Sequence, residues 1–298
     1  MIQPQPRSWP VTRVFAPDGS RAPAASEAGR RGGGAPQRRP GFGDRVERLG
    51  HVLRTAFLFA VFGIGAVVLA GGLLPILSRF GGRRADRELV AQRWIHRLFR
   101  AFLRLGTAVG QFELSDSGVE RLREGAGLVV ANHPTLLDVV MLISRLPQAD
   151  CIVKRAAWRN PFLRGIVSAA GYVPNDDGEA LVNACAERLQ AGRTVLLFPE
   201  GSRSPRGGLG PFKRGAARAA LQSGCPITPV VVRCDPPALN KADPHYFPTR
   251  KLRFSIAVGE PFEAGRLAHP DEAPAAAARR ITRELRSYFE ARLDHGCD

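Results

Sequence analysis

Residues 128–138 read LVVANHPTLLD, and they combine the pattern of a buried strand with a pair of reactive side chains. The four apolar residues Leu128–Ala131 have the length and composition of a strand buried in a sheet. Pro134 is favoured at the first position of a helix, so we expect a helix to follow, with His133 near its N-cap. Asp138 then lies about one turn into that helix, within reach of the imidazole. Ligands of α/β sheets collect where strands end and helices begin, so we expect the functional site here.

A histidine beside a carboxylate is what general base catalysis requires. The carboxylate of Asp138 would fix the tautomer of His133 and stabilise the imidazolium, while the other ring nitrogen takes a proton from a substrate hydroxyl. The alternative is structural, because strand ends and helix N-caps attract such residues without any catalytic role.

A second polar segment follows another apolar run, Val195–Phe198. Residues 198–204 read FPEGSRS, in which Gly201 permits close backbone approach and Arg203 offers a planar fork of donors suited to phosphate. Lys213 and Arg214 add positive charge just beyond. The alternative is a structural turn with a solvated arginine, since loops after strands are commonly polar and glycine-rich.

Together the two segments resemble the glycerolipid acyltransferase family, typified by 1-acylglycerol-3-phosphate acyltransferases. The family motif NHxxxxD matches residues 132–138, and FPEGTRS matches residues 198–204 with Ser202 in place of threonine. A short apolar run around proline, ITPVV at residues 227–231, is similar to the family's last motif. The resemblance covers about residues 110–262.

The resemblance implies a role for each matching residue. His133 is the base, Asp138 orients it, and Glu200, Gly201 and Arg203 bind the acceptor. We also expect Asn132 and Ser202 among the substrate-binding residues. The resemblance also implies acyl-CoA or acyl carrier protein as donor, a lysolipid as acceptor, and no cofactor or covalent acyl-enzyme. The sequence also lacks a GxSxG nucleophile elbow, so a serine-hydrolase mechanism has little support.

One motif departs from the family. Where an arginine is expected about six residues after a glycine, the run from Gly171 carries Asp176 and Asp177 instead. Carboxylates repel phosphate, which disfavours a second phosphate contact and so disfavours lysophosphatidate as the acceptor. An amino-acid lipid, a lysophospholipid with a masked phosphate and a hydroxyl on a specialised acyl chain are left open. Alternatively, these aspartates cap the next helix. Lys154 and its basic neighbours are predicted as replacement cations, or else as a solvated basic face.

The pattern of the chain predicts a single α/β acyltransferase domain, with a mostly parallel sheet flanked by helices, over residues 108–265. We expect strands at Leu128–Ala131, Val195–Phe198, Ile227–Val232 and Leu252–Val258. We expect helices at about Thr135–Arg145, Glu179–Gln190, Arg214–Gln222 and residues 275–295. Residues 1–43, rich in Arg, Pro, Gly and Ala, read as a disordered basic tail.

An apolar segment precedes this domain. Residues 55–77 contain no charged side chain, and arginines flank the segment on both sides. A helix of roughly 23 residues is about 34 Å long, which is enough to cross a bilayer. Glycines and Pro75 weaken its second half, so a tilted span, a half-inserted hairpin and a buried soluble helix are all open. Residues 86–106 predict an amphipathic helix with an apolar and an arginine face, lying in the membrane interface or packing on the core. We expect a membrane protein with its catalytic domain on the cytoplasmic face.

Composition narrows the function without fixing it. The formal charge of +16 suits phosphates, anionic lipid or acidic carrier proteins, and few aromatics make nucleic acid the weaker partner. The five cysteines are scattered, which favours buried free thiols that act as small hydrophobic side chains over a disulfide framework. The histidines show no metal-ligand spacing. The main alternative to an acyltransferase is a catalytically silent lipid- or carrier-binding module on the same fold.

Overall fold

The computed structural model describes residues 41–73, 82–123, 127–175, 178–205, 208–240, 247–263 and 271–294. Of the predicted basic tail at 1–43, only residues 41–43 lie within these ranges. Residues 74–77 of the predicted membrane segment also lie outside them.

Within these ranges, eight strands form one mostly parallel sheet, as the sequence predicted. They are β1 (Phe112–Ser117), β2 (Leu128–Ala131), β3 (Asp150–Val153), β4 (Val173–Pro174), β5 (Val195–Leu197), β6 (Pro226–Asp235), β7 (Leu252–Val258) and β8 (Phe262–Glu263). The order is β1-β7-β6-β2-β5-β3-β4, and β8 pairs with β6. Only the pairings of β6 with β7 and β8 are antiparallel. The carboxyl ends of β2 and β5, which precede the two motifs, therefore lie side by side.

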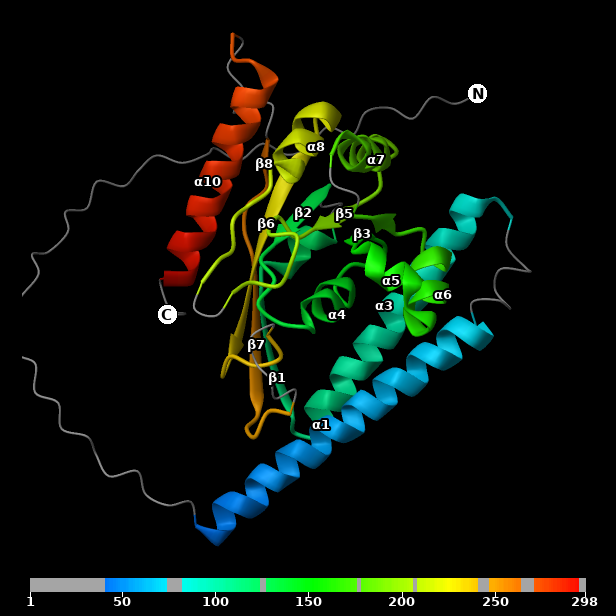
Figure 1. Ribbon diagram of the computed structural model, residues 1–298, viewed down its shortest axis with the longest axis vertical. Coiled ribbons are helices and arrows are strands. Elements are labelled where there is room, and N and C mark those ends of the chain that lie inside the picture. The colour runs from blue at the N-terminus through cyan, green and yellow to red at the C-terminus, as the bar shows by residue number, and fades with distance from the viewer. Residues whose placement is uncertain are drawn as a thin grey trace, which may run out of the picture.

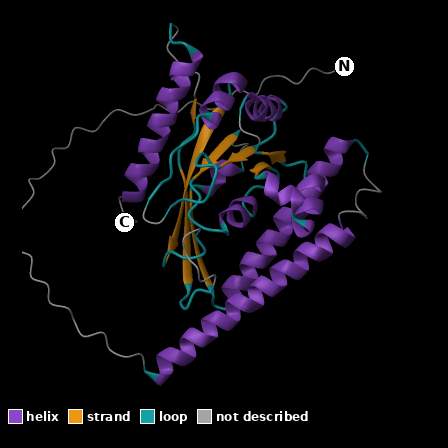
Figure 2. Ribbon diagram, in the orientation of Figure 1, coloured by secondary structure: helices purple, strands orange, loops and turns teal. Residues whose placement is uncertain are grey.

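Helices cover both faces of this sheet (Figure 1, Figure 2). They are α1 (Phe42–Val68, continued by a π-helical turn over Leu69–Leu73), α3 (Arg84–Ala108), α4 (Asp138–Ile143), α5 (Arg155–Arg159), α6 (Pro161–Ala169), α7 (Glu179–Gln190), α8 (Gly215–Ser223) and α10 (Pro274–Asp294). A 3-10 turn spans Val119–Leu122. The predicted helices at 86–106, Glu179–Gln190, Arg214–Gln222 and 275–295 are present within two residues at each end.

Side chains alternate along β2 and divide the core in two. Val129 and Ala131 join the apolar cluster under α1, α3, α4 and α6. Leu128 and Val130 join the cluster under α7, α8 and α10. Because successive strand residues point to opposite faces, the four apolar residues of this central strand are buried on both sides.

The described part of α1 lies beside α3, with a stacked contact between the rings of Phe62 and Phe99 at 6.1 Å (Figure 1). On α3 the predicted faces are present except at one residue. Ile95 is buried and the four arginines of the basic face are exposed at positions 93, 97, 100 and 104, whereas Leu98 of the predicted apolar face is exposed. Whether either helix lies in a membrane interface stays a prediction.

A buried ion network, missed by the sequence analysis, joins α3 to the sheet and α7. Glu88 lies 3.1 Å from Arg188 and 3.2 Å from Arg193, measured between the charged atoms. Arg193 also reaches Asp150 on β3 at 2.6 Å, and Gln92 donates to that carboxylate at 2.9 Å. These polar side chains interrupt apolar patterns, which is why the strand at Asp150–Val153 was not expected.

The cysteines within the described residues behave as predicted small hydrophobes. Cys151 and Cys185 are buried, and Cys225 and Cys234 are half-buried, all as free thiols. Burial raises the pKa of the Cys151 and Cys185 thiols to about 12, so both stay protonated and unreactive at neutral pH. Cys297 lies outside the described residues.

Candidate active site

The predicted His–Asp pair is formed where β2 ends. Nδ1 of His133 lies 2.8 Å from Oδ2 of Asp138. The predicted local geometry was wrong, however, because α4 begins only at Asp138 rather than near Thr135. The Asp138 carboxylate accepts the N–H of Thr135 at 2.7 Å and its hydroxyl at 2.5 Å. These bonds wrap residues 133–137 into a turn around the carboxylate, in place of the first helical turn that Pro134 suggested.

The turn favours one tautomer of the neutral imidazole. An ionised Asp138 carboxylate only accepts hydrogen bonds, so it favours the tautomer with the proton on Nδ1 and the lone pair on Nε2 of His133. Asp138 is fully buried, and this burial raises the pKa of its carboxyl against the lowering effects of His133 and Thr135. The side chain of His133 keeps 17% of its surface exposed, so a substrate can approach it.

An aromatic ring supports His133 from the second motif. Phe198 stacks on the imidazole with ring centroids 4.3 Å apart and planes 27° from parallel. Phe198 follows β5, the parallel neighbour of β2, so adjacent strand ends bring the two motifs into contact. This contact was not predicted from the sequence, although the position of Phe198 in the motif was the available signal.

Asn132 holds two strand ends together. Its side-chain amide donates to the carbonyl of Val232 at 2.8 Å and accepts the N–H of Val232 at 2.7 Å. Because both ends of the buried carboxamide are engaged by β6, the residue ties the His133 turn to that strand. Its predicted contact with the acceptor stays a prediction.

Glu200 is buried, with both carboxylate oxygens turned toward protein donors. Oε1 accepts the backbone N–H of His133 at 3.1 Å and the hydroxyl of Ser204 at 2.7 Å. Oε2 accepts the N–H of Gly210 at 2.7 Å. In return, the N–H of Ser204 donates to the carbonyl of His133 at 2.7 Å. The carboxylate thus links the two motif loops, and its predicted acceptor contact is not tested.

Arg203 is anchored by a residue that the sequence analysis missed. Its guanidinium donates to the carbonyl of Leu239 at 3.0 Å, and the same carbonyl accepts the N–H of Leu136 at 3.0 Å. Leu239 has a φ of +56°, which is uncommon for a residue with a branched side chain. Its strained backbone directs one carbonyl at both motif loops, and nothing in the sequence around position 239 signals this.

The remaining predicted residues lie around the second motif or apart from it. Gly201 and Ser202 form the half-buried turn after Glu200, with Gly201 at a φ of +64°. Lys154 is exposed just before α5. Asp176 and Asp177, which replace the expected arginine, lie outside the described residues.

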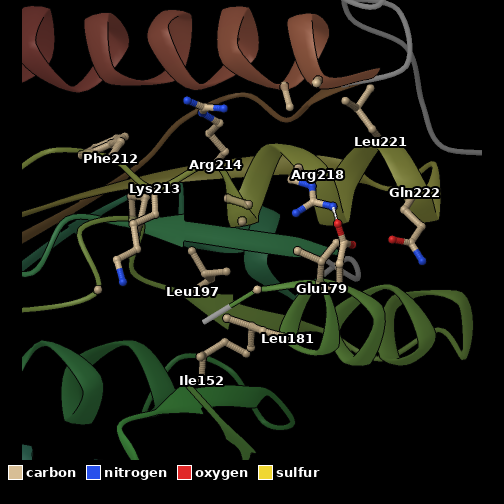
Figure 3. Close-up of a pocket in the computed structure, with 18 of the residues that line it drawn as sticks. Ile152, Glu179, Leu181, Leu197, Phe212, Lys213, Arg214, Arg218, Leu221 and Gln222 are labelled. Carbon is tan, nitrogen blue, oxygen red and sulfur yellow. Dashed lines mark hydrogen bonds and ion pairs between the residues drawn. The ribbon is translucent and has the colours of Figure 1, made fainter. Parts of the chain in front are cut away.

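A cavity of about 1020 Å³ adjoins the motif loop on the face of α7, α8 and α10 (Figure 3). Phe198, Pro199 and Gly201 form part of its wall, so it meets the site at the ring that stacks on His133. Phe212, Lys213 and Arg214 lie at one end in Figure 3, and Leu221 and Gln222 lie at the other. The Glu179–Arg218 ion pair lies between them.

Within the described ranges, no three His, Cys, Asp or Glu side chains come together as a metal site requires. The predictions that the protein uses no metal and no cofactor stay predictions.

Fold and site together define the class of protein: an α/β acyltransferase domain with a His–Asp pair at the ends of parallel strands. Residues 113–233 match the family model described as Acyltransferase. This match contains the motifs at residues 132–138 and 198–204, and the chain is similar to curated 1-acyl-sn-glycerol-3-phosphate acyltransferases.

Individual relatives agree with this placement. The chain is 29% identical over 196 residues to a chloroplastic 1-acyl-sn-glycerol-3-phosphate acyltransferase of Brassica napus, covering 62% of this chain and 54% of that protein. It is 34% identical over 179 residues to human 1-acyl-sn-glycerol-3-phosphate acyltransferase beta, covering 55% and 59% respectively. The chain thus spans a little over half the length of these curated relatives.

A solved structure has the same fold. The crystal structure of the 1-acyl-sn-glycerophosphate acyltransferase of Thermotoga maritima superimposes with a TM-score of 0.62 at 19% sequence identity. The alignment covers 86% of this chain and all of that one.

Proposed function

We propose that this protein is a membrane-bound O-acyltransferase that acylates the free hydroxyl of 1-acylglycerol-3-phosphate or a related lysophospholipid. The donor is a fatty acyl thioester of coenzyme A or acyl carrier protein. The observation that carries the proposal is the 2.8 Å contact between His133 Nδ1 and the buried Asp138 carboxylate, because it leaves Nε2 of a partly exposed imidazole to act as the base.

The chemistry follows from that protonation state. Nε2 of His133 takes the proton of the acceptor hydroxyl as its oxygen attacks the thioester carbonyl, and the imidazolium forms beside the Asp138 carboxylate. The tetrahedral intermediate then collapses, the C–S bond breaks, and the departing thiolate takes the proton from Nε2. An oxygen ester and a free thiol result, and His133 returns to its starting form. No residue is acylated, so hydroxyl and thioester must be bound together.

The second motif supports binding of a phosphate-bearing acceptor. Arg203 is half-buried and fixed through the Leu239 carbonyl, which uses one of its five N–H donors. A pre-oriented guanidinium loses little conformational entropy when it binds a phosphate. The names of the curated relatives support 1-acylglycerol-3-phosphate as the acceptor.

The surface of α1 supports membrane attachment. Among the described residues, one helix is long and apolar enough to cross a membrane, Phe42–Gly72, with a mean hydropathy of 2.2 in its most apolar stretch. Only 17% of that stretch is buried. Exposed apolar side chains recur along one side of it, mostly at spacings of three, four or seven residues: Val46, Leu49, Leu53, Phe57, Ile64, Val67 and Val68. We propose that this stripe contacts lipid, with the catalytic domain on the cytoplasmic face.

Acyl transfer is tested with detergent-purified protein, labelled acyl-CoA or acyl carrier protein thioester, and a panel of lysolipids. A labelled diacyl product is expected, and His133→Ala should lower kcat by about 10²–10⁴-fold. Arg279→Gln, at an exposed position on α10, is the preparation control. If neither the panel nor a total lipid extract yields product with folded wild-type protein, the catalytic proposal fails and a lipid- or carrier-binding module takes its place.

A further inference from the structure

Lys213 lies directly against the motif loop. Its backbone N–H donates to the carbonyl of Pro199 at 2.7 Å, which fixes its Cα beside the loop. Its side chain then passes over Gly201: a Cβ at that glycine would lie 3.1 Å from Cε and 3.4 Å from Nζ of Lys213. The ammonium is therefore within a few ångströms of the turn that leads to Arg203.

Gly201 leaves room for the Lys213 side chain beside the motif loop. Gly201 adopts a φ of +64°, which side-chain-bearing residues rarely adopt, and any added Cβ would crowd the end of the Lys213 side chain. Glycine at this position thus serves two needs, the turn itself and room for the lysine. Lys213 also belongs to the cavity wall, beside Phe212 and Arg214 (Figure 3), and Phe198 and Gly201 line the same cavity.

A cation is missing from its expected place in this chain. The segment after Gly171 carries Asp176 and Asp177 where the family pattern has an arginine. Lys154, which the sequence suggested as a replacement, is exposed at the start of α5, and the described wall of the cavity includes Lys213 but not Lys154.

The geometry points to Lys213 as a specificity-determining residue that binds the phosphate of the acceptor, as a second cation besides Arg203. This inference rests on the proposed acyltransferase function. In 1-acylglycerol-3-phosphate the reacting hydroxyl and the phosphate are borne by adjacent carbons, so a phosphate held near Gly201 leaves the hydroxyl near His133. The phosphate of a pantetheine thioester lies at the far end of a long arm, which fits a cation beside the motif loop less well.

The test measures substrate constants for the full chain in detergent. Wild type, Lys213→Gln, Lys213→Arg and Arg214→Gln are compared for the KM of lysophosphatidate, the KM of acyl-CoA, and the inhibition constant of glycerol 3-phosphate. We expect Lys213→Gln to raise the lysophosphatidate KM and the glycerol 3-phosphate constant by about tenfold or more, because a charge-assisted hydrogen bond is lost. The acyl-CoA KM should stay within about twofold, and Lys213→Arg should retain most of the wild-type binding.

Three results would overturn the inference. A rise confined to the acyl-CoA KM would assign Lys213 to the donor. Equal rises of the lysophosphatidate KM in Lys213→Gln and Arg214→Gln would mean that binding depends on the overall positive charge at this end of the cavity and not on Lys213 itself. Unchanged constants in an active Lys213→Gln enzyme would remove the residue from binding. Absence of turnover in wild type, by contrast, would refute the proposed function itself.

Discussion

The backbone N–H of His133 donates to Oε1 of Glu200 at 3.1 Å, so the base of one motif is held by the carboxylate of the other. Neither oxygen of Glu200 faces open solvent, since the hydroxyl of Ser204 and the N–H of Gly210 take the remaining positions. Glu200 thus positions His133 through its backbone N–H, and its predicted contact with the acceptor stays a prediction.

The prediction for Glu200→Gln follows from its three donors. The amide NH₂ must face one of them, so the loop shifts and the base is displaced. We expect kcat to fall by about a hundredfold, as ångström-scale misplacement of a catalytic group can cause. The KM of the acceptor should change by no more than about twofold. Steady-state kinetics separates the two roles: a large rise in acceptor KM with kcat retained would instead establish direct contact.

The pH dependence of stability tests the environment of Asp138. Burial raises the pKa of its carboxyl above the ordinary 3.8, so the folded chain holds this proton more tightly than the unfolded chain. The stabilisation from the protonated form is fully present below the unfolded value and is lost as pH rises through the raised folded value. The carboxamide that the Asp138→Asn variant carries has no such proton to lose.

We therefore expect Asp138→Asn to gain stability relative to wild type as pH rises from about 4 to 7. Urea denaturation midpoints of both proteins, measured across that range, report the difference. A difference in urea midpoint that stayed constant with pH, or that favoured wild type more as pH rose, would contradict a raised pKa. The hydrogen bonds from His133 and Thr135 would then outweigh the effect of burial on the pKa of Asp138.

The sequence predicted those parts of the fold that follow from local patterns. Leu128–Ala131 and Leu252–Val258 are strands at the predicted bounds, because uninterrupted or alternating apolar residues leave little choice. The strand at Asp150–Val153 was missed because its buried aspartate is compensated by Arg193, from a distant part of the chain. Tertiary ion pairs of this kind leave no periodic signal.

In the site, too, features set by local sequence were predicted and features set by tertiary contacts were not. Motif spacing was enough to place His133 beside Asp138, whereas the start of α4 was misplaced by three residues. The error arose because Pro134 was read as a helix start, while the Asp138 carboxylate in fact captures the Thr135 backbone. The role of Leu239 could not be predicted for another reason. Its backbone carbonyl accepts the hydrogen bond from Arg203, and any residue type carries such a carbonyl.

Gly171 offers a matched test of the buried ion network. A Cβ there would lie 2.3 Å from Cδ of Glu88, and its φ is +64°. Gly192 has a similar φ of +73°, with nothing within 4 Å of its notional Cβ. Gly192→Ala should thus lose only the conformational cost of a left-handed alanine, about 1–2 kcal/mol.

Gly171→Ala should destabilise by about 3 kcal/mol more than that control, because Glu88 must leave Arg188 and Arg193 partly unpaired. Chemical denaturation of both variants measures the difference directly. Equal losses in the two variants would mean that Glu88 yields without strain and that the network adds little to stability.

The apolar stripe on α1 gives the last prediction, which concerns membrane attachment. Leu53 and Phe57 are 59% and 48% exposed, on the side of the helix that faces away from the domain. Burying such side chains in lipid gains about 1.5–3 kcal/mol each, so replacing both by aspartate should lower the partition coefficient by at least about tenfold. Flotation of freshly synthesised full-length chain with phosphatidylcholine–phosphatidylglycerol vesicles measures this. Adding 0.5 M salt suppresses the attraction of the arginines to anionic lipid and isolates the apolar contribution.

Ala180→Asp, exposed on α7 at the opposite face of the sheet, carries an added charge without touching the stripe and should float like wild type. Undiminished flotation of the double variant at high salt would mean that another surface holds the protein at the bilayer.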